Sequence, residues 1–393
     1  MLTRKDCLKN NFARYTSIGG KLAAHFDVMP KTFCLPKEYL SFIEAYSQAA
    51  ENEELRYPHR SPGSVNWWIL KPAGLSRGRG ISLVNDIGQV TYGDKAVIQE
   101  YCRDPWLLDG FKVDFRIYVL VTSFNPLEAF IYDDSFARVA CVPYSTEPGD
   151  LGNKFIHLTN SSIQLKDGLS RVNLKVPPKR EDVGGTKLHM SYIWKRLEAE
   201  GADVEKLKQD IDDVIVKTLV VVDEAIPNQV NSFELFGYDI LIDANFKPWL
   251  IEVNASPSMK CENELDRRVK DPLIRDTIAL VNPLPFDRLE LLRVMEERLE
   301  RIHTDRTRPY ANPAVMRDRR EKEGSLTDFD RKMAKILQRS KPRRYGELPA
   351  HLGRYRRLAP GGPSYRAAMK MKKMCIKRVK VPERGNRRRP HRR

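Results

Sequence analysis

The chain has 393 residues, of which 41% are hydrophobic, enough for a sizeable core in one large or two medium domains. No stretch approaches the roughly 18 consecutive apolar residues of a membrane span, and residues 1–6 lack the apolar run of a signal peptide. The six cysteines lie far apart without a CxxC pair, so we expect a reduced, cytoplasmic protein that has no cysteine metal site and does not enter membranes.

The net charge of +16 is concentrated in the C-terminal part of the chain. Residues 331–393 hold 23 Lys and Arg against 2 Asp and Glu, a local charge of +21, which leaves −5 for residues 1–330. Such a tail is predicted to bind a polyanion, either an acidic protein or nucleic acid. Nucleic acid is disfavoured, because the tail has few aromatic residues and no recognisable nucleic-acid-binding module accompanies it.

Hydrophobic periodicity predicts an α/β chain. Residues 1–60 indicate a helix, a short strand at 32–35 and a second helix at 37–54, followed by a polar loop. Strand candidates then follow in order: WWIL, GISLV, AVIQEY, KVDFRIYVLV, EAFIYD and ARVACV. Next come a helical stretch at 190–225, the strands FGYDILID and PWLIEV, a helix near Pro272 and a charged helix at 286–302.

We divide the chain accordingly into four parts. The parts are residues 1–60, 61–150, 151–302 and 303–393, of which the last is a basic, largely disordered arm with some helix at 326–339.

The stretch KPWLIEVNASPSM places Glu252 and Asn254 on one face of an apolar strand. If the preceding strand pairs with it as a hairpin, with Asp243 opposite Pro248, Asp239 lies across from Glu252 on the same face. Two carboxylates and a carboxamide would then converge, which is a ligand set suited to Mg²⁺. The alternative is a pair of strand ends with solvated charges.

Several polar patterns suggest a nucleotide site. Lys71 ends a strand and precedes a loop with three glycines and two arginines, which suits phosphates, although it also suits an exposed hairpin. Lys112, Asp114 and Arg116 alternate with apolar residues, so they share one strand face, either in a cleft or in water. Arg138 lies between apolar β residues and is a candidate for binding an acidic substrate. His157 has no nucleophile partner and is more typical of a core or capping histidine.

These motifs, in this order, resemble the tubulin–tyrosine-ligase-like family over roughly residues 1–285, closest to its polyglutamylase branch. The resemblance rests on WILKP with the loop SRGRGI, QEY, KVDFRIYVLV, FAR, HLTNSSIQ, FELFGYDILID and PWLIEVNASPS. It implies an ATP-grasp fold with the nucleotide between two β-sheet lobes. The opening LTRKDCLKNNFARY resembles the end of the family's N-terminal lobe, so we expect residues 1–60 to be its remnant, in a shortened protein or an incomplete sequence.

The resemblance also implies site residues. Those expected at ATP are Lys71, Arg77, Gly78, Gln99, Glu100, Tyr101, Cys102, Lys112, Asp114, Thr159 and Asn160. Those expected at the incoming glutamate are Arg138, Ser161, Ser162, Lys187 and Lys270. Asp239, Glu252 and Asn254 are expected to bind Mg²⁺, and Arg116 and Glu252 to be catalytic.

The expected activity is ATP-dependent ligation of free L-glutamate to glutamate side chains of α/β-tubulin C-terminal tails, through an acylphosphate. Microtubules would be the partner, and the expected location is the cytoskeleton, at the axoneme or basal body of a cilium or flagellum. Two alternatives stay open at this point: ligation of glycine by the same chemistry, and an inactive microtubule-binding protein.

Overall fold

The structure is a computed structural model that describes residues 2–56, 66–74, 78–93, 95–164, 174–226, 232–283, 287–306, 328–337 and 343–379. The chain groups into two compact units. The main unit comprises Met1–Thr277 and Leu352–Arg393, and the small unit comprises Ile278–His351. The boundaries predicted near residues 60 and 150 stay predictions.

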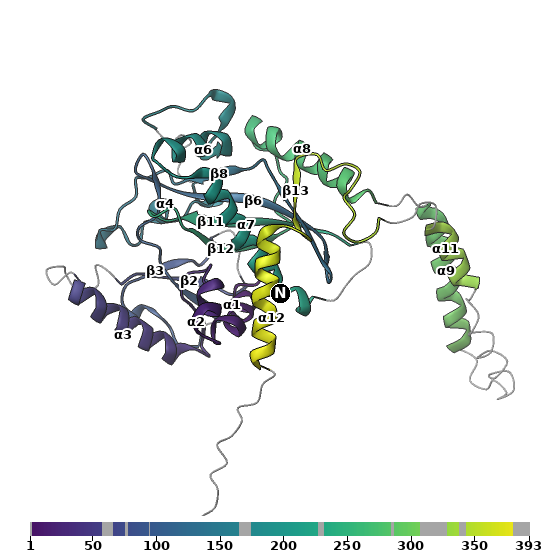
Figure 1. The fold of residues 1–393 in the computed structure, drawn as a ribbon, viewed down its shortest axis with the longest axis horizontal. Helices are drawn as coiled ribbons and strands as arrows, with labels where there is room; N and C mark the ends of the chain where they lie inside the picture. Colours follow the sequence, from purple (N-terminus) through teal and green to yellow (C-terminus); the bar gives the residue numbers. More distant parts are fainter. Residues whose placement is uncertain are drawn as a thin grey trace, which may run out of the picture. The chain divides into compact units, whose positions relative to one another are not determined.

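The smaller sheet of the main unit has four antiparallel strands in the order β1-β4-β2-β3 (Figure 1). Their bounds are Thr32–Leu35 for β1, Trp68–Pro72 for β2, Ser82–Val84 for β3 and Ala96–Glu100 for β4. Helix α3, Tyr39–Arg56, packs on this sheet, and Phe42, Trp68 and Ile98 lie in the core between them. The opposite face carries a second apolar cluster, with Trp67, Ile69 and Leu83, next to the polar side chain of Lys71.

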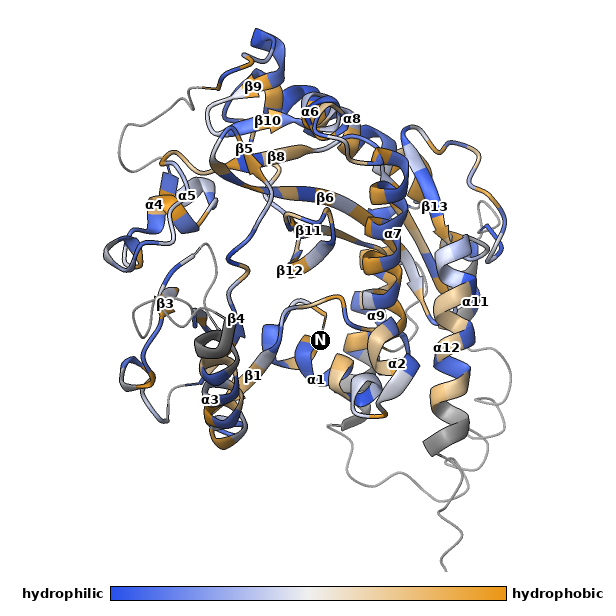
Figure 2. Ribbon diagram, turned by 60° about the vertical axis from the view of Figure 1, so that its left-hand side comes forward, coloured by the Kyte–Doolittle hydropathy of each residue, from blue (hydrophilic) through white to orange (hydrophobic). Residues whose placement is uncertain are grey.

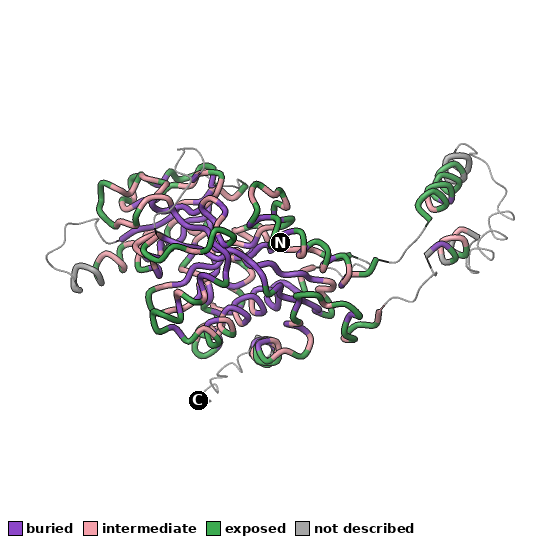
Figure 3. Tube along the Cα trace, turned by 90° about the horizontal axis from the view of Figure 1, so that it is seen from above, coloured by how far each residue is buried: buried purple, intermediate pink, exposed green. Residues whose placement is uncertain are grey.

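The larger sheet contains the order β12-β11-β6-β8-β10-β9, with β5, β7 and β13 attached at β6 and β7. Its long strands are β6, Phe111–Phe124, β11, Glu234–Ile242, and β12, Pro248–Ala255. The shorter strands are β5 Leu107–Leu108, β7 Leu127–Tyr132, β8 Phe136–Val139, β9 Val183–Gly184 and β10 Lys187–His189. Buried residues follow these strands in Figure 3. The strands predicted between residues 67 and 143 are therefore confirmed.

Helices cover the outer face of the larger sheet. Helix α7, Val204–Val220, carries the long hydrophobic stripe visible in Figure 2 and packs against β12. Helices α1, Lys5–Thr16, and α2, Gly20–His25, join the same hydrophobic core through residues such as Phe12 and Leu22. None of the described helices combines the length and the apolar character needed to cross a membrane.

Local capping decides three boundaries that periodicity missed. The single helix expected at 190–225 is two helices, α6 at Met190–Ala199 and α7, because Gly201 has a φ of 89° and Asp203 caps the new start. No helix was predicted around His157, yet Asn153 caps the short helix α4, Lys154–His157. Helix α8, Glu264–Val281, starts well before Pro272, since the Asn263 side chain accepts the Asp266 N–H at 2.9 Å.

The expectation of a largely disordered C-terminal arm is wrong for much of residues 352–379. Strand β13, Tyr355–Ala359, pairs with β7, and helix α12, Pro363–Val379, packs on α7. The physical reason is spacing: Ala368 and Cys375 recur on one helix face and are buried, while the basic residues that dominate the composition occupy other positions. Buried Lys372 also donates to Asp223.

The small unit contains helices α9, Arg288–Arg306, and α11, Asp328–Leu337. They pack against each other: Lys332 pairs with Glu297 at 2.9 Å, and the Arg298 guanidinium lies 4.1 Å from the centre of the Phe329 ring. The helix predicted within 326–339 is thus confirmed, and the charged helix predicted at 286–302 extends slightly further.

We predict that Gly353→Ala lowers the free energy of unfolding by about 2 kcal/mol or more. Gly353 has a φ of 54°, and an added Cβ would overlap the Asp276 carboxylate, which accepts hydrogen bonds from Tyr132 and Arg354. Urea denaturation measures the change. Gly152→Ala is the control, because its Cβ would meet open space. Equal stabilities of the two variants would contradict the placement of residues 352–359 in the folded main unit.

Candidate active site

The β11–β12 hairpin brings Asp239 directly opposite Glu252, as predicted. The predicted pairing of Asp243 with Pro248 is wrong, because Ile242 pairs with Pro248. A bulge then leaves Ile251 without an opposite residue, and this extra residue moves the register by one and restores the Asp239–Glu252 pair. The two carboxylates therefore share a face because of an irregularity that the sequence pattern did not reveal.

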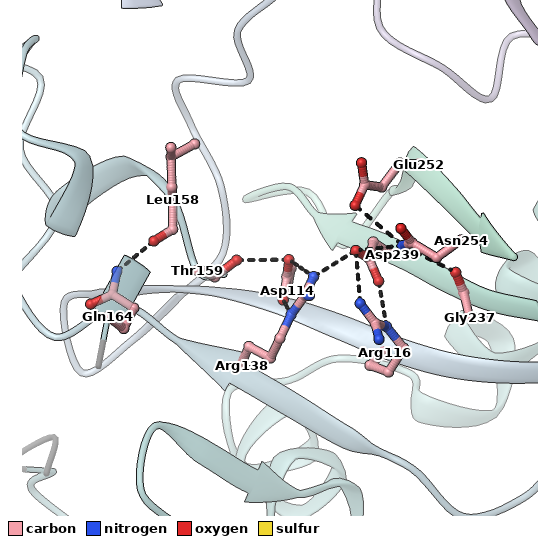
Figure 4. A network of polar contacts seen from close by, with 10 residues as sticks. All are labelled: Asp114, Arg116, Arg138, Leu158, Thr159, Gln164, Gly237, Asp239, Glu252 and Asn254. Carbon is pink, nitrogen blue, oxygen red and sulfur yellow. Dashed lines mark hydrogen bonds and ion pairs between the residues drawn. The ribbon is translucent and has the colours of Figure 1, made fainter. Parts of the chain in front are cut away.

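Asp239 is the centre of a network of buried charges, drawn in Figure 4. Its carboxylate, 1% exposed, accepts from Arg116 Nε at 2.6 Å and Nη2 at 3.1 Å. Arg138 Nη2 lies 2.8 Å from its Oδ2. Arg138 also donates to both oxygens of Asp114, at 2.7 and 2.5 Å, and Thr159 Oγ1 donates to Asp114 Oδ2 at 2.7 Å.

The alternation of strand β6 explains why these charges meet. Asp114 and Arg116 point to the same face, and antiparallel pairing sets Asp114 opposite Arg138 on β8 and Arg116 opposite Asp239 on β11. Burial alone would raise the pKa of Asp239, but Arg116 and Arg138 outweigh it and hold the pKa well below its usual range. Two aspartates and two arginines thus compensate one another inside the protein.

The three predicted metal ligands converge at one end of this network. Asn254 Nδ2 lies 3.2 Å from both Asp239 Oδ2 and Glu252 Oε1 (Figure 4). The described residues contain no group of three or more His, Cys, Asp or Glu side chains placed for a metal. A set of two carboxylates and one carboxamide is nevertheless the kind that a hard divalent cation takes together with water and phosphate oxygens. Rotation of the Asn254 amide would present its oxygen in place of its NH₂ group.

One cavity between the two sheets contains most of the predicted nucleotide residues. Its lining includes Lys71, Gly78, Gln99, Glu100, Tyr101, Cys102, Lys112, Asp114, Thr159, Asn160, Asp239 and Glu252. Arg79, Arg138 and His157 line it as well. Arg116 is not among the lining residues, although it bonds to Asp239, which is, and Arg77 lies outside the described residues.

Two buried lysines enter the cavity from different sheets. Lys71 on β2 donates to Gln99 Oε1 at 2.7 Å, and Lys112 on β6 donates to the Tyr101 hydroxyl at 2.7 Å. Burial disfavours their charged forms and lowers the pKa of each to about 8. An anion placed between them would stabilise the ammonium forms, so the cavity is built to receive negative charge.

Close packing fixes Gly78 at the wall of the cavity. Gly78 has a φ of 71°, and a Cβ there would overlap the side chain of Ile163, just after the helix start at Ser161. His157 bonds to the Tyr101 hydroxyl and to the Asp150 carbonyl, each at 3.0 Å, and burial lowers its pKa to about 4. A neutral imidazole that makes two hydrogen bonds is suited to stabilising the wall of the cavity.

The predicted glutamate-binding residues are not brought into one cluster. Lys187 and Lys270 both pair with Asp266, whereas Ser162 lines a second hollow beside Gly78 and Lys154. Ser161 begins the short helix α5, Ser161–Gln164. Arg138 lines the main cavity, and its register partner on β10 is Lys187.

Sequence reasoning missed Lys5 and Asp266. Lys5 Nζ lies 3.3 Å from Glu252 Oε2 and lines the cavity, although 247 residues separate the two positions in the chain. Asp266 is fully buried beneath two lysines. The only available signal for Asp266 was its helical spacing to Lys270, i to i+4, which also describes an ordinary surface ion pair.

Comparison with known proteins gives one family and several relatives. A model of the tubulin-tyrosine ligase family matches residues 1–290. The chain is 38% identical over 288 residues to the tubulin polyglutamylase TTLL5 of Homo sapiens, covering 71% of this chain and 21% of that protein. It is 33% identical over 380 residues to the tubulin polyglutamylase ttll6 of Danio rerio, covering 93% and 43%.

A third relative, the probable tubulin polyglutamylase TTLL2 of Homo sapiens, is 37% identical over 281 residues, covering 71% of this chain and 44% of that protein. The chain thus spans less than half the length of each of these relatives. The resemblance drawn from the motifs is confirmed, as is the expected α/β, ATP-grasp class of the fold. The chain belongs to the tubulin-tyrosine ligase family.

Proposed function

We propose that the protein is an ATP-dependent tubulin polyglutamylase that ligates glutamate to glutamate side chains of tubulin C-terminal tails. The observation that carries the proposal is the single cavity in which two buried lysines face the carboxylates of Asp239 and Glu252. The names of the relatives support the substrate, because all three are tubulin polyglutamylases, one of them described as probable.

ATP is the proposed occupant of this cavity. Lys71, Lys112 and the loop with Arg77 and Gly78 would bind its phosphates, while the segment from Gln99 through Glu100 and Tyr101 to Cys102 would border the adenine. Asp114, Thr159 and Asn160 would complete the nucleotide contacts. Asp239, Glu252 and Asn254 would hold Mg²⁺, which would neutralise phosphate charge when bound.

The proposed reaction has two steps. The γ-phosphoryl group of ATP passes to a carboxylate oxygen of the tubulin glutamate, which gives an acylphosphate and ADP. The free α-amine of L-glutamate then attacks the acyl carbon; the C–N bond forms, the C–O bond to phosphate breaks, and the amine loses a proton.

The protein's part in this reaction is alignment and electrostatic stabilisation. Arg116 is oriented by its two bonds to Asp239 and is proposed to stabilise the transferred phosphoryl group. Arg138, Ser161, Ser162, Lys187 and Lys270 are proposed to receive the incoming glutamate. Because Arg138 is engaged by two aspartates, a cation at Asp239 would compete with it and free its guanidinium for the substrate carboxylate.

Charge supports the proposed macromolecular partner. Helix α12 exposes Arg366, Lys370 and Lys373 in a region whose local charge is strongly positive. Acidic tubulin tails and microtubules would be attracted to such a surface, and added salt would weaken the attraction. A cytoskeletal location, such as the axoneme or basal body of a cilium, follows from this proposal.

We predict that Glu252→Gln reduces incorporation of labelled glutamate into microtubules by at least about 100-fold, because it removes a charged metal ligand. Mass spectrometry after incubation with ATP and Mg²⁺ measures the product, and labelled glycine in a parallel reaction tests the glycine alternative. Sedimentation with microtubules should be unchanged. The exposed Glu198→Gln is the control and should retain full activity. A wild-type protein that sediments but incorporates neither amino acid would disprove a ligase.

We predict that affinity for an ATP analogue falls at least about tenfold between pH 7 and pH 9. Lys71 and Lys112 have a pKa of about 8, so their ammonium forms are present below that pH and are lost as the pH rises through it. Calorimetric titration at pH 7, 8 and 9 measures the dissociation constant. Lys112→Arg stays charged and should reduce the dependence, whereas an affinity that is constant with pH would contradict phosphate binding by these lysines.

A further inference from the structure

Lys187 and Lys270 share a single buried counter-ion. Lys187 Nζ lies 3.0 and 2.8 Å from the two oxygens of Asp266, and Lys270 Nζ lies 2.9 Å from its Oδ1. The exposed fractions are 7%, 3% and 0% for Lys187, Lys270 and Asp266. Two desolvated ammonium groups side by side repel each other, and the carboxylate between them offsets this repulsion and holds both in place.

The arrangement leaves hydrogen-bonding capacity for another oxygen. An ammonium group has three N–H donors. Lys270 donates one N–H to Asp266 and one to the Lys260 carbonyl, which lies 2.5 Å away. Lys187 donates at most two N–H groups to the oxygens of Asp266. Each lysine therefore retains one N–H beyond these hydrogen bonds. Lys187, Lys270 and Asp266 together carry a charge of +1, which the Glu262 carboxylate, 3.7 Å from Lys187 Nζ, offsets without a hydrogen bond.

Three contacts fix the first turns of α8, which carry Asp266, against the β9–β10 hairpin. Asp266 binds Lys187, and Arg268 Nη1 pairs with Asp182 Oδ1 at 2.9 Å. Asn263 packs so closely on Gly184 that a Cβ added to Gly184 would overlap the side-chain amide of Asn263. Asp266 is held in turn by the backbone N–H of Glu262 at 3.1 Å. The counter-ion thus has one position relative to β10.

This lysine pair adjoins Arg138 on the active-site face of the sheet. Lys187 is the direct register partner of Arg138, so both side chains point to the same face. The ring of Phe136, two residues from Arg138, lies 5.4 Å from Lys187 Nζ and 5.9 Å from Lys270 Nζ. A carboxylate bound by the free donors would lie beside the Asp114–Arg138–Asp239 network.

We infer that Asp266 is a positioning residue, which aims Lys187 and Lys270 at a carboxylate of the incoming amino acid. The inference rests on the proposed ligase function and adds a residue that would not touch the substrate itself. It makes the amino-acid site depend on one carboxylate buried in α8, while the nucleotide cavity keeps its own lysines, Lys71 and Lys112.

The test is steady-state kinetics of the full chain with tubulin, Mg²⁺ and ATP. Asp266→Asn should raise the KM for glutamate at least about tenfold and leave the KM for ATP within about twofold. Asp266→Glu should recover part of the loss, because it keeps the charge. Asp182→Asn is the matched control: it breaks the Arg268 contact of the same helix without touching either lysine, and its KM for glutamate should stay within about twofold.

A second variant and a binding measurement separate positioning from folding. Asp266→Asn combined with Lys270→Met restores the charge balance of the cluster, so its Tm should recover relative to Asp266→Asn while its KM for glutamate stays raised. For each protein, the increase in Tm is recorded on addition of L-glutamate, L-aspartate or glycine. Mg²⁺ and a non-hydrolysable ATP analogue are present throughout.

The outcomes are distinguishable. If Asp266→Asn keeps the glutamate KM of the wild type, or raises the KM of glutamate and ATP equally, the inference is overturned and the ligase stands. If the wild type uses a different amino acid and Asp266→Asn raises the KM for that one, the inference holds and the glutamate assignment falls. If no amino acid shifts the wild-type Tm or is incorporated, both are wrong.

Discussion

The active-site face depends on the compensation of charge around Asp239. Arg116 and Arg138 donate to this buried carboxylate, and Arg138 extends the network to Asp114. Removal of one member would leave an uncompensated charge in the interior, which typically costs about 3–5 kcal/mol. Because side chains alternate along the strands, the charged ones gather on one face of the larger sheet. A metal, a nucleotide and an acidic substrate would each require such side chains.

Two kinds of lysine surround this network, and their environments differ. Lys71 and Lys112 hydrogen-bond to neutral groups, so burial lowers their pKa and a bound phosphate would stabilise their ammonium forms. Lys187 and Lys270 instead have Asp266 as a counter-ion within the fold. One pair thus lacks a direct carboxylate partner, while the other already has one, which suits two substrates of different charge.

The C-terminal segment gives a more general lesson about composition. Its excess of basic residues predicted disorder, yet strand β13 completes the larger sheet at β7 and α12 packs on α7. A basic composition averages over both faces of a helix, whereas folding depends on the few apolar positions that recur on one face, such as Ala368 and Cys375. The exposed Arg366, Lys370 and Lys373 remain available to an acidic partner.

By itself, the sequence determined the strands between residues 67 and 143 and the two strands of the β11–β12 hairpin. It also determined the shared face of Lys112, Asp114 and Arg116 and the order of motifs that indicates the family, because these are local properties of alternation and spacing. Tertiary structure alone decided the contacts between distant segments. It set Lys5 against Glu252, buried Asp266 beneath Lys187, and inserted the bulge at Ile251 that keeps Asp239 opposite Glu252. Such contacts depend on which strands and helices become neighbours, and a pattern of adjacent residues holds no information about partners that lie tens to hundreds of positions away.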